Sequence, residues 1–139
     1  MQLIHDHLHD VDPALTRIPL TVDRLTLAKR RWRGTANDGA EFGFDLEAPV
    51  IDGDVFFTSE TSAYYILQTE EMVLEVAIGD DAASAVRLGW MIGNLQFALE
   101  IAAGVVRVPD SPSLRQLFDS EQLPYKPAQR VFRPLIGQV

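Results

Sequence analysis

The chain has 139 residues, of which 47% are hydrophobic and 23% charged, and its formal net charge is −8. This length allows one domain or two small ones with a buried core. The acidic balance argues against nucleic acid or an anionic membrane as the main partner. The absence of cysteine excludes disulfides and thiolate metal sites. No apolar run approaches the ~18 residues of a membrane span, and the first residues do not resemble a secretory signal. We therefore expect a cytoplasmic globular protein.

The first half of the chain consists of short strand-like segments separated by turns. Residues 31–46 alternate charged and bulky side chains on either side of a turn at residues 36–39, which predicts a hairpin with one apolar face. Asp52 and Gly53 mark a further turn. The pattern predicts a small, mostly antiparallel β domain over residues 1–70.

The second half changes to a mixture of strand and helix periods. The expected elements are a strand at 72–78, a helix that begins after Asp80 or Asp81 and stops at Gly93-Asn94, strands at 97–101 and 105–108, a helix from Pro112 to about Asp119, and a strand at 128–132. The order β-α-β-β-α-β is that of a ferredoxin-like domain. The sequence thus predicts an α+β fold in which a small antiparallel β domain precedes a ferredoxin-like domain at 71–139, with a short tail after Pro134.

The first of these expected helices is apolar on two sides. Val86, Gly89 and Ile92 recur at helical spacing. The other side is made apolar by Leu88, Trp90 and Met91, and Arg87 is the only charged residue after the cap. A helix of this kind requires two apolar partners. We expect one to be its own sheet and the other to be a second subunit, in a homodimer.

Several segments together resemble one known family. They are the hairpin at 29–46 with its basic arm, the turn Asn37-Asp38-Gly39, the segment Asp52-Gly53-Asp54-Val55, and the strand segment at 73–76. In this order and spacing they resemble the urease accessory protein UreE, a family of nickel metallochaperones. The resemblance covers about residues 17–134. It implies a β domain followed by a ferredoxin-like domain, a homodimer, and urease with its other accessory proteins as partners.

The metal-binding motif of that family is altered here. The family has Leu-Gly-Asn-Arg-His, and this chain has Ile92-Gly93-Asn94-Leu95-Gln96. The resemblance therefore places Gln96 where the metal-binding histidine stands, and Met91 where a second histidine is often found. It also implies a dimer contact made by Trp90, Met91, Gly93, Asn94 and Gln96. Because a neutral amide is a weak ligand for nickel, we expect the interfacial metal site to be absent.

All three histidines of the chain lie near its beginning, at His5, His7 and His9. In an extended segment their imidazoles share one side. Imidazole nitrogen is a suitable ligand for nickel, the expected cargo, and for zinc. We therefore predict a metal site at these histidines. The alternative is a solvated polar segment that binds no metal.

The basic arm, residues 29–33, stands out in an acidic protein. Arg30, Arg31 and Arg33 are predicted to dock an acidic partner, with Trp32 as an anchor. The alternative is the solvated face of an edge strand.

No nucleophile elbow, phosphate loop or catalytic histidine arrangement is present in the sequence, so we expect no enzyme. Two hypotheses follow. The chain either assists urease maturation as a nickel carrier, or it is a metal-free module that docks on the maturation factors.

Overall fold

The computed structural model describes residues 1–135, and the tail predicted after Pro134 therefore lies almost wholly outside the described residues. The chain divides into two compact units, Met1–Thr69 and Glu70–Val139. Both helices and strands are present in quantity, which confirms the α+β class. Within residues 1–135, no helix combines the length and the hydrophobicity that crossing a bilayer demands.

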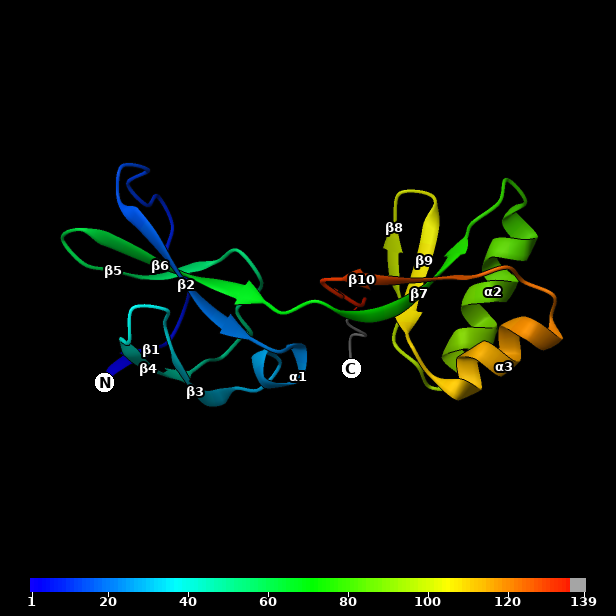
Figure 1. The fold of residues 1–139 in the computed structure, drawn as a ribbon, viewed down its shortest axis with the longest axis horizontal. Helices are drawn as coiled ribbons and strands as arrows, with labels where there is room; N and C mark the ends of the chain where they lie inside the picture. The colour runs from blue at the N-terminus through cyan, green and yellow to red at the C-terminus, as the bar shows by residue number, and fades with distance from the viewer. Residues whose placement is uncertain (136–139) are drawn as a thin grey trace. The chain divides into compact units, whose positions relative to one another are not determined.

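The first unit contains two three-stranded sheets (Figure 1). One has the order β1-β4-β3 and the other the order β2-β6-β5. The elements are β1 (Gln2–Ile4), β2 (Thr16–Val22), the short helix α1 (Arg24–Leu27), β3 (Arg31–Thr35), β4 (Glu41–Asp45), β5 (Val55–Thr58) and β6 (Ser62–Gln68). The predicted hairpin over residues 31–46 is confirmed as β3 and β4, which pair antiparallel.

The expectation of an antiparallel domain is wrong for two of the strand pairs in this unit. β1 runs parallel to β4, and β2 runs parallel to β6. Both early strands join the edge of a hairpin formed later in the chain, and the long connection between partners permits the parallel direction. Alternation in a sequence predicts which face a residue occupies, but it carries no information on the direction of the partner strand.

The core of the first unit is rich in aromatic rings. Trp32 and Phe44 stack with centroids 3.8 Å apart, and Phe42 meets Phe56 edge-on at 4.9 Å. A Cβ atom at Gly34, where β3 passes β2, would lie 2.9 Å from Leu20 Cδ2, so the buried Leu20 side chain would have to shift. The two sheets of the first unit therefore pack closely against each other.

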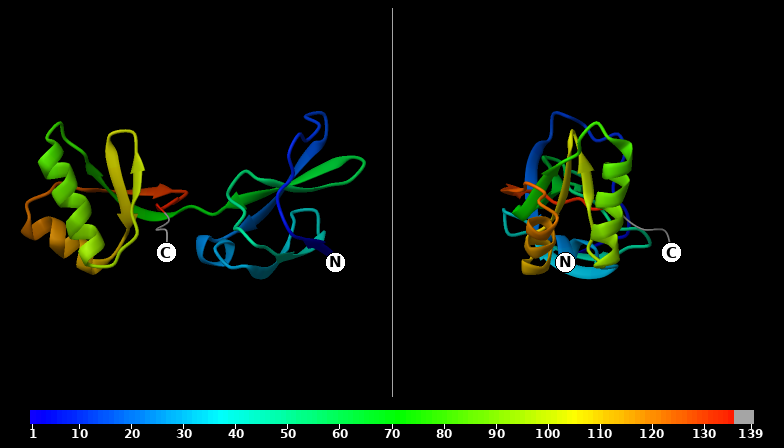
Figure 2. Two further views of the ribbon diagram at one scale, coloured as in Figure 1. Left: turned by 180° about the vertical axis from the view of Figure 1, so that it is seen from behind. Right: turned by 90° about the vertical axis from the view of Figure 1, so that its right-hand side faces the viewer.

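The second unit is a single four-stranded antiparallel sheet with the order β10-β7-β9-β8. Its elements are β7 (Glu71–Ala77), α2 (Ala82–Asn94), β8 (Glu100–Ala102), β9 (Val105–Pro109), α3 (Pro112–Ser120) and β10 (Lys126–Arg130), the predicted order of strands and helices. The hydrophobic core of this unit joins Leu74 and Val108 of the sheet to Ile92 of α2 and Phe118 of α3. Both helices thus cover the same face of the sheet (Figures 1 and 2).

Helix α2 ends at Asn94, within the Gly93-Asn94 pair at which the sequence predicted its end. Gly93 and Asn94 both belong to the helix, and the residue with left-handed backbone is Gln96, with φ of 64°. The amides of Leu95 and Gln96 donate to the carbonyls of Ile92 and Gly93 in a final tight turn. Asn and Gly are frequent at helix ends, and here the chain turns directly after them.

The face of the sheet opposite the helices carries an ion-pair network. Arg107 Nε donates to Glu75 Oε2 at 2.6 Å, and its Nη1 lies 3.7 Å from Glu100 Oε1. Arg130 Nε lies 3.5 Å from the same Glu75 oxygen. The hydrogen bond from Arg107 holds the pKa of Glu75 below its ordinary value.

The segment after β10 crosses this same face. The Arg133 amide donates to Glu100 Oε1 at 3.2 Å, and the Leu135 amide donates to the Leu99 carbonyl at 2.7 Å. Because β10 and β8 are opposite edges of the sheet, residues 131–135 span its width. Phe132, within this segment, is fully buried.

Candidate functional site

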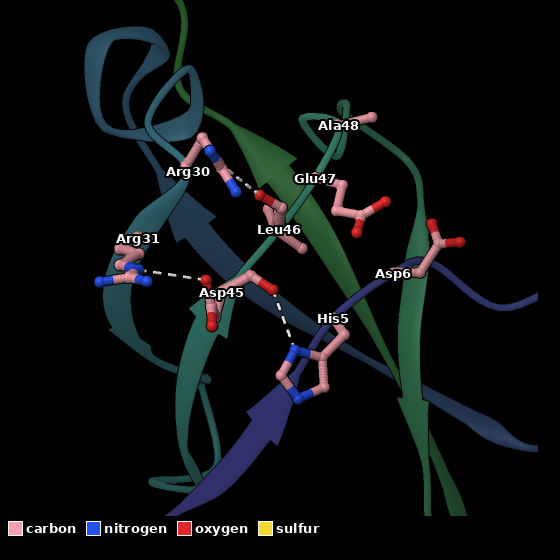
Figure 3. Close-up of a pocket in the computed structure, with 8 residues that line it drawn as sticks. All are labelled: His5, Asp6, Arg30, Arg31, Asp45, Leu46, Glu47 and Ala48. Carbon is pink, nitrogen blue, oxygen red and sulfur yellow. Dashed lines mark hydrogen bonds and ion pairs between the residues drawn. The ribbon is translucent and has the colours of Figure 1, made fainter.

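His5 follows the last residue of β1 and is held against β4. Its Nδ1 lies 3.0 Å from the carbonyl oxygen of Asp45 (Figure 3). A carbonyl can only accept, so Nδ1 carries the proton and Nε2 of the neutral ring is free. The parallel pairing of β1 with β4 is what brings His5 to this position.

The ring of His5 borders a pocket of about 560 Å³ in the first unit. The other residues that line it are Asp6, Arg30, Arg31, Asp45, Leu46, Glu47 and Ala48. Two arginines of the basic arm are fixed here: Arg30 Nε donates to the Leu46 carbonyl, and Arg31 Nε donates to the carboxylate of Asp45 at 3.2 Å (Figure 3). The pocket therefore mixes both signs of charge.

His7 and His9 form a separate pair. Their ring centroids are 4.6 Å apart in an edge-to-face arrangement. His7 Nδ1 lies 3.0 Å from Asp6 Oδ1, and the same oxygen accepts from the His7 amide at 2.7 Å. The amide of Leu8, between the two histidines, donates to the Val55 carbonyl at 2.7 Å and fixes the backbone to β5.

The structure does not gather the three predicted ligands. Among residues 1–135, no group of three or more His, Cys, Asp or Glu side chains is placed to hold a metal ion. His7 and His9 lie together, whereas His5 is directed to Asp45. Asp6, which contacts His7, is not among the predicted ligands, and its position directly before a histidine is the one local signal of that contact.

The predicted dimer surface on α2 is only partly exposed. Trp90 is 65% exposed and Val86, which the prediction missed, is 74% exposed. These two residues, with Ala82, Ala83 and Arg87, line a shallow apolar hollow. Gly93, Asn94 and Gln96 are also exposed. Met91, in contrast, is 7% exposed and packs in the core of its own unit, so it has little surface to offer a second copy.

The basic arm differs from its prediction at one residue. Trp32 is 8% exposed and stacks on Phe44 in the core, so its ring is not presented as an anchor. Arg30, Arg31 and Arg33 lie at the surface of β3 and the turn before it. Any docking role therefore rests on the arginines alone.

Comparisons with known proteins identify the second unit. The family described as "UreE urease accessory protein, C-terminal domain" matches residues 71–139. Over 134 residues the chain is 26% identical to the urease accessory protein UreE of Alteromonas mediterranea. The aligned region covers 94% of this chain and 83% of that protein.

Two further relatives carry the same name. The protein of Azorhizobium caulinodans is 28% identical over 120 residues, and that of Bifidobacterium longum subsp. infantis is 28% identical over 98 residues. The matches cover 85% and 70% of this chain, but the chain spans only 57% and 44% of the lengths of these two relatives. The match of the second unit and the likeness of the whole chain lead to one conclusion: the chain belongs to the UreE family of urease accessory proteins.

Proposed function

We propose that this chain is a nickel metallochaperone that assists the assembly of the urease metal centre. The observation that carries the proposal is the likeness to the urease accessory protein UreE of Alteromonas mediterranea over most of both chains. Nickel is the cargo in this proposal, with zinc as a possible substitute. The partners are urease and its other accessory proteins, the place of action is the cytoplasm, and the chain has no enzymatic activity of its own.

We also infer that the second unit is a ferredoxin-like domain. Numbered within the unit, its strands have the order 4-1-3-2, all neighbours are antiparallel, and two helices follow the first and third strands. This arrangement supports a split β-α-β domain in which both helices cover one face. The opposite face of the sheet carries the ion-pair network and residues 131–135.

The proposal includes a homodimer formed through α2. Val86 and Trp90 expose an apolar surface on one side of this helix, and Gly89 and Gly93 add no side chain to it. Tryptophan is frequent among the residues that dominate binding at interfaces. A two-fold contact here would bring two copies of the exposed Gln96 toward one another.

Gln96 is poorly suited to hold the cargo. Its amide offers a neutral oxygen, whereas nickel favours imidazole nitrogen. The chain's histidines all lie in the first unit. The proposal therefore assigns nickel to that segment, at an affinity lower than that of a site with a full set of ligands.

The second candidate is a metal-free module that docks on the maturation factors. It is favoured by the lack of any three-ligand group within residues 1–135 and by the exposed arginines of the basic arm. In an acidic protein, these arginines would provide the surface for an acidic partner.

Urease activity in a cell that carries a urease operon without its own UreE tests both candidates. A metallochaperone should raise urease activity most strongly when nickel is scarce, and added nickel should replace it. Activation that is unchanged in a variant unable to bind nickel would favour the docking module. No activation at any nickel concentration would contradict the urease role.

A further inference from the structure

We propose that His7 and His9 alone supply the protein ligands for the nickel ion, that the Asp6 carboxylate orients His7, and that His5 is not a ligand. The inference rests on the proposed function for the identity of the ion, but the site itself is argued from the geometry of the first unit.

The separation of the two rings fits a shared ion. With metal–nitrogen bonds of about 2.1 Å and an angle of about 90–110° at the metal, two imidazoles on one ion have ring centroids roughly 4.6–5.3 Å apart. The ring centroids of His7 and His9 are 4.6 Å apart, at the short end of this range. Both side chains are accessible, since His9 is exposed and His7 is half-buried.

Asp6 prepares His7 for this role. Its Oδ1 accepts from the His7 amide at 2.7 Å and lies 3.0 Å from His7 Nδ1. With the ring proton on Nδ1, beside this carboxylate, the lone pair that can bind a metal is on Nε2. A carboxylate on the far nitrogen is the usual support of a metal-bound histidine, because it fixes the ring and raises its basicity.

The backbone of this segment is also fixed. The Leu8 amide donates to the Val55 carbonyl at 2.7 Å, and this bond ties the residue between the two histidines to β5. The pair is thus held by a strand rather than free in solution, and less conformational entropy is lost when an ion binds.

His5 is directed elsewhere. Its Nδ1 is bound to the Asp45 carbonyl of β4, whereas Leu8, between His7 and His9, is tied to β5. In Figure 3 the Asp6 carboxylate points away from the His5 ring. A site of two protein ligands leaves the remaining positions of the ion to water or to an acceptor protein, which suits a carrier that must release its cargo.

Isothermal titration of the untagged chain with Ni²⁺ alone tests the site, with His5→Ala as the matched control for His7→Ala and His9→Ala. We expect the His7 and His9 variants each to lose at least about tenfold in affinity and the His5 variant to bind as the wild type does. Paramagnetic broadening in ¹H–¹⁵N spectra should centre on residues 6–9 and the facing part of β5. Far-UV circular dichroism checks that each variant is folded.

Several results would overturn the site. They are an equal loss in His5→Ala, unchanged binding in His7→Ala and His9→Ala, or a loss that appears only in Gln96→Ala. In those cases nickel still binds and the carrier role stands. If the wild type binds no nickel, the site and the nickel role both fail. If nickel binds at His7 and His9 but urease activity is not restored in cells, the proposed function fails while the site remains.

Discussion

The histidines of this chain and the segment that resembles the UreE metal motif lie in different units. The first unit holds every histidine of the protein, and two of these rings lie side by side. The second unit matches the family's carboxy-terminal domain and keeps the helix end of the metal motif, but it presents Gln96 where the resemblance places a histidine. A sequence can therefore keep the scaffold of a metal site without keeping its ligands. A match to the scaffold alone does not establish where the metal binds.

The largest expected effect concerns the scaffold, in Trp90→Glu. If α2 forms the dimer contact, a charge at this exposed tryptophan should weaken dimerisation about thirtyfold or more, since interface tryptophans contribute about 2 kcal/mol or more. Sedimentation equilibrium measures the dissociation constant. Leu25→Glu, at a residue of the first unit that is 68% exposed, is the matched control. Equal weakening in both variants, or none in Trp90→Glu, would show that the dimer does not use α2.

The next effect tests what stabilises the second unit, in Glu75→Gln. This change breaks a charge-assisted hydrogen bond with Arg107 on a largely buried carboxylate, and we expect a loss of about 2 kcal/mol in the free energy of unfolding at pH 7. Urea unfolding followed by Trp90 fluorescence, in a Trp32→Phe background, reports on the second unit alone because the chain has two tryptophans, one in each unit.

The same variant has a defined pH dependence. The pKa of Glu75 is lowered in the folded state from an ordinary value of 4.5, so its contribution is fully present above that pH and is lost as the pH falls through the folded pKa. The wild type and Glu75→Gln should therefore converge in stability under acid conditions. A difference that stays constant from pH 7 to pH 3 would exclude the ion pair as its source.

Gln96→His should restore a ligand to the scaffold. Histidine tolerates the left-handed backbone better than most residues, so Gln96, with φ of 64°, is a permissive position. In a background with His7→Ala and His9→Ala, we expect nickel affinity to rise at least about tenfold, with about one ion per dimer. Gln96→Asn, which keeps an amide, is the control. No gain would mean that the two copies of residue 96 do not meet.

The smallest expected effect is in Gly93→Ala. Nothing lies within 4 Å of a Cβ placed there, and the residue is inside α2 with ordinary helical backbone. Alanine should stabilise the folded monomer by about 0.5–1 kcal/mol through helix propensity. Thermal unfolding of dilute protein measures this. A simultaneous loss of dimer affinity would place Gly93 within the close contact rather than at its rim.

Much of the second unit could be predicted because its elements differ in period. The order of its strands and helices is as predicted, since the change from alternation to helical spacing is visible in the residues themselves. The end of α2 was also predictable from Gly93-Asn94, whereas the left-handed Gln96 after it was not, because that turn is closed by backbone bonds to Ile92 and Gly93. The ion pairs of Glu75 with Arg107 and Arg130 could not be predicted, because they depend on the register between strands that are far apart in the sequence.

The site in the first unit was harder to predict. His5 is separated from His7 because β1 pairs in parallel with β4, which sets His5 beside Asp45. A parallel partner about forty residues away leaves no local signal in a three-residue strand. Trp32 was expected at the surface because it lies among arginines, but the alternation of β3 directs it into the core. Alternation thus outweighed the charge of its neighbours.

The segment that spans the sheet, residues 131–135, also bears on the order in which the two units can fold during synthesis. The second unit needs β10 at one edge and the Leu135–Leu99 bond at the other, so its sheet cannot be completed before residue 135 has left the ribosome. Every strand pair of the first unit, in contrast, is available once Thr69 has emerged, and domains commonly fold as they are synthesised. If the first unit folds as it is synthesised, the histidine pair forms before residues 82–94, which carry the α2 surface, have been added.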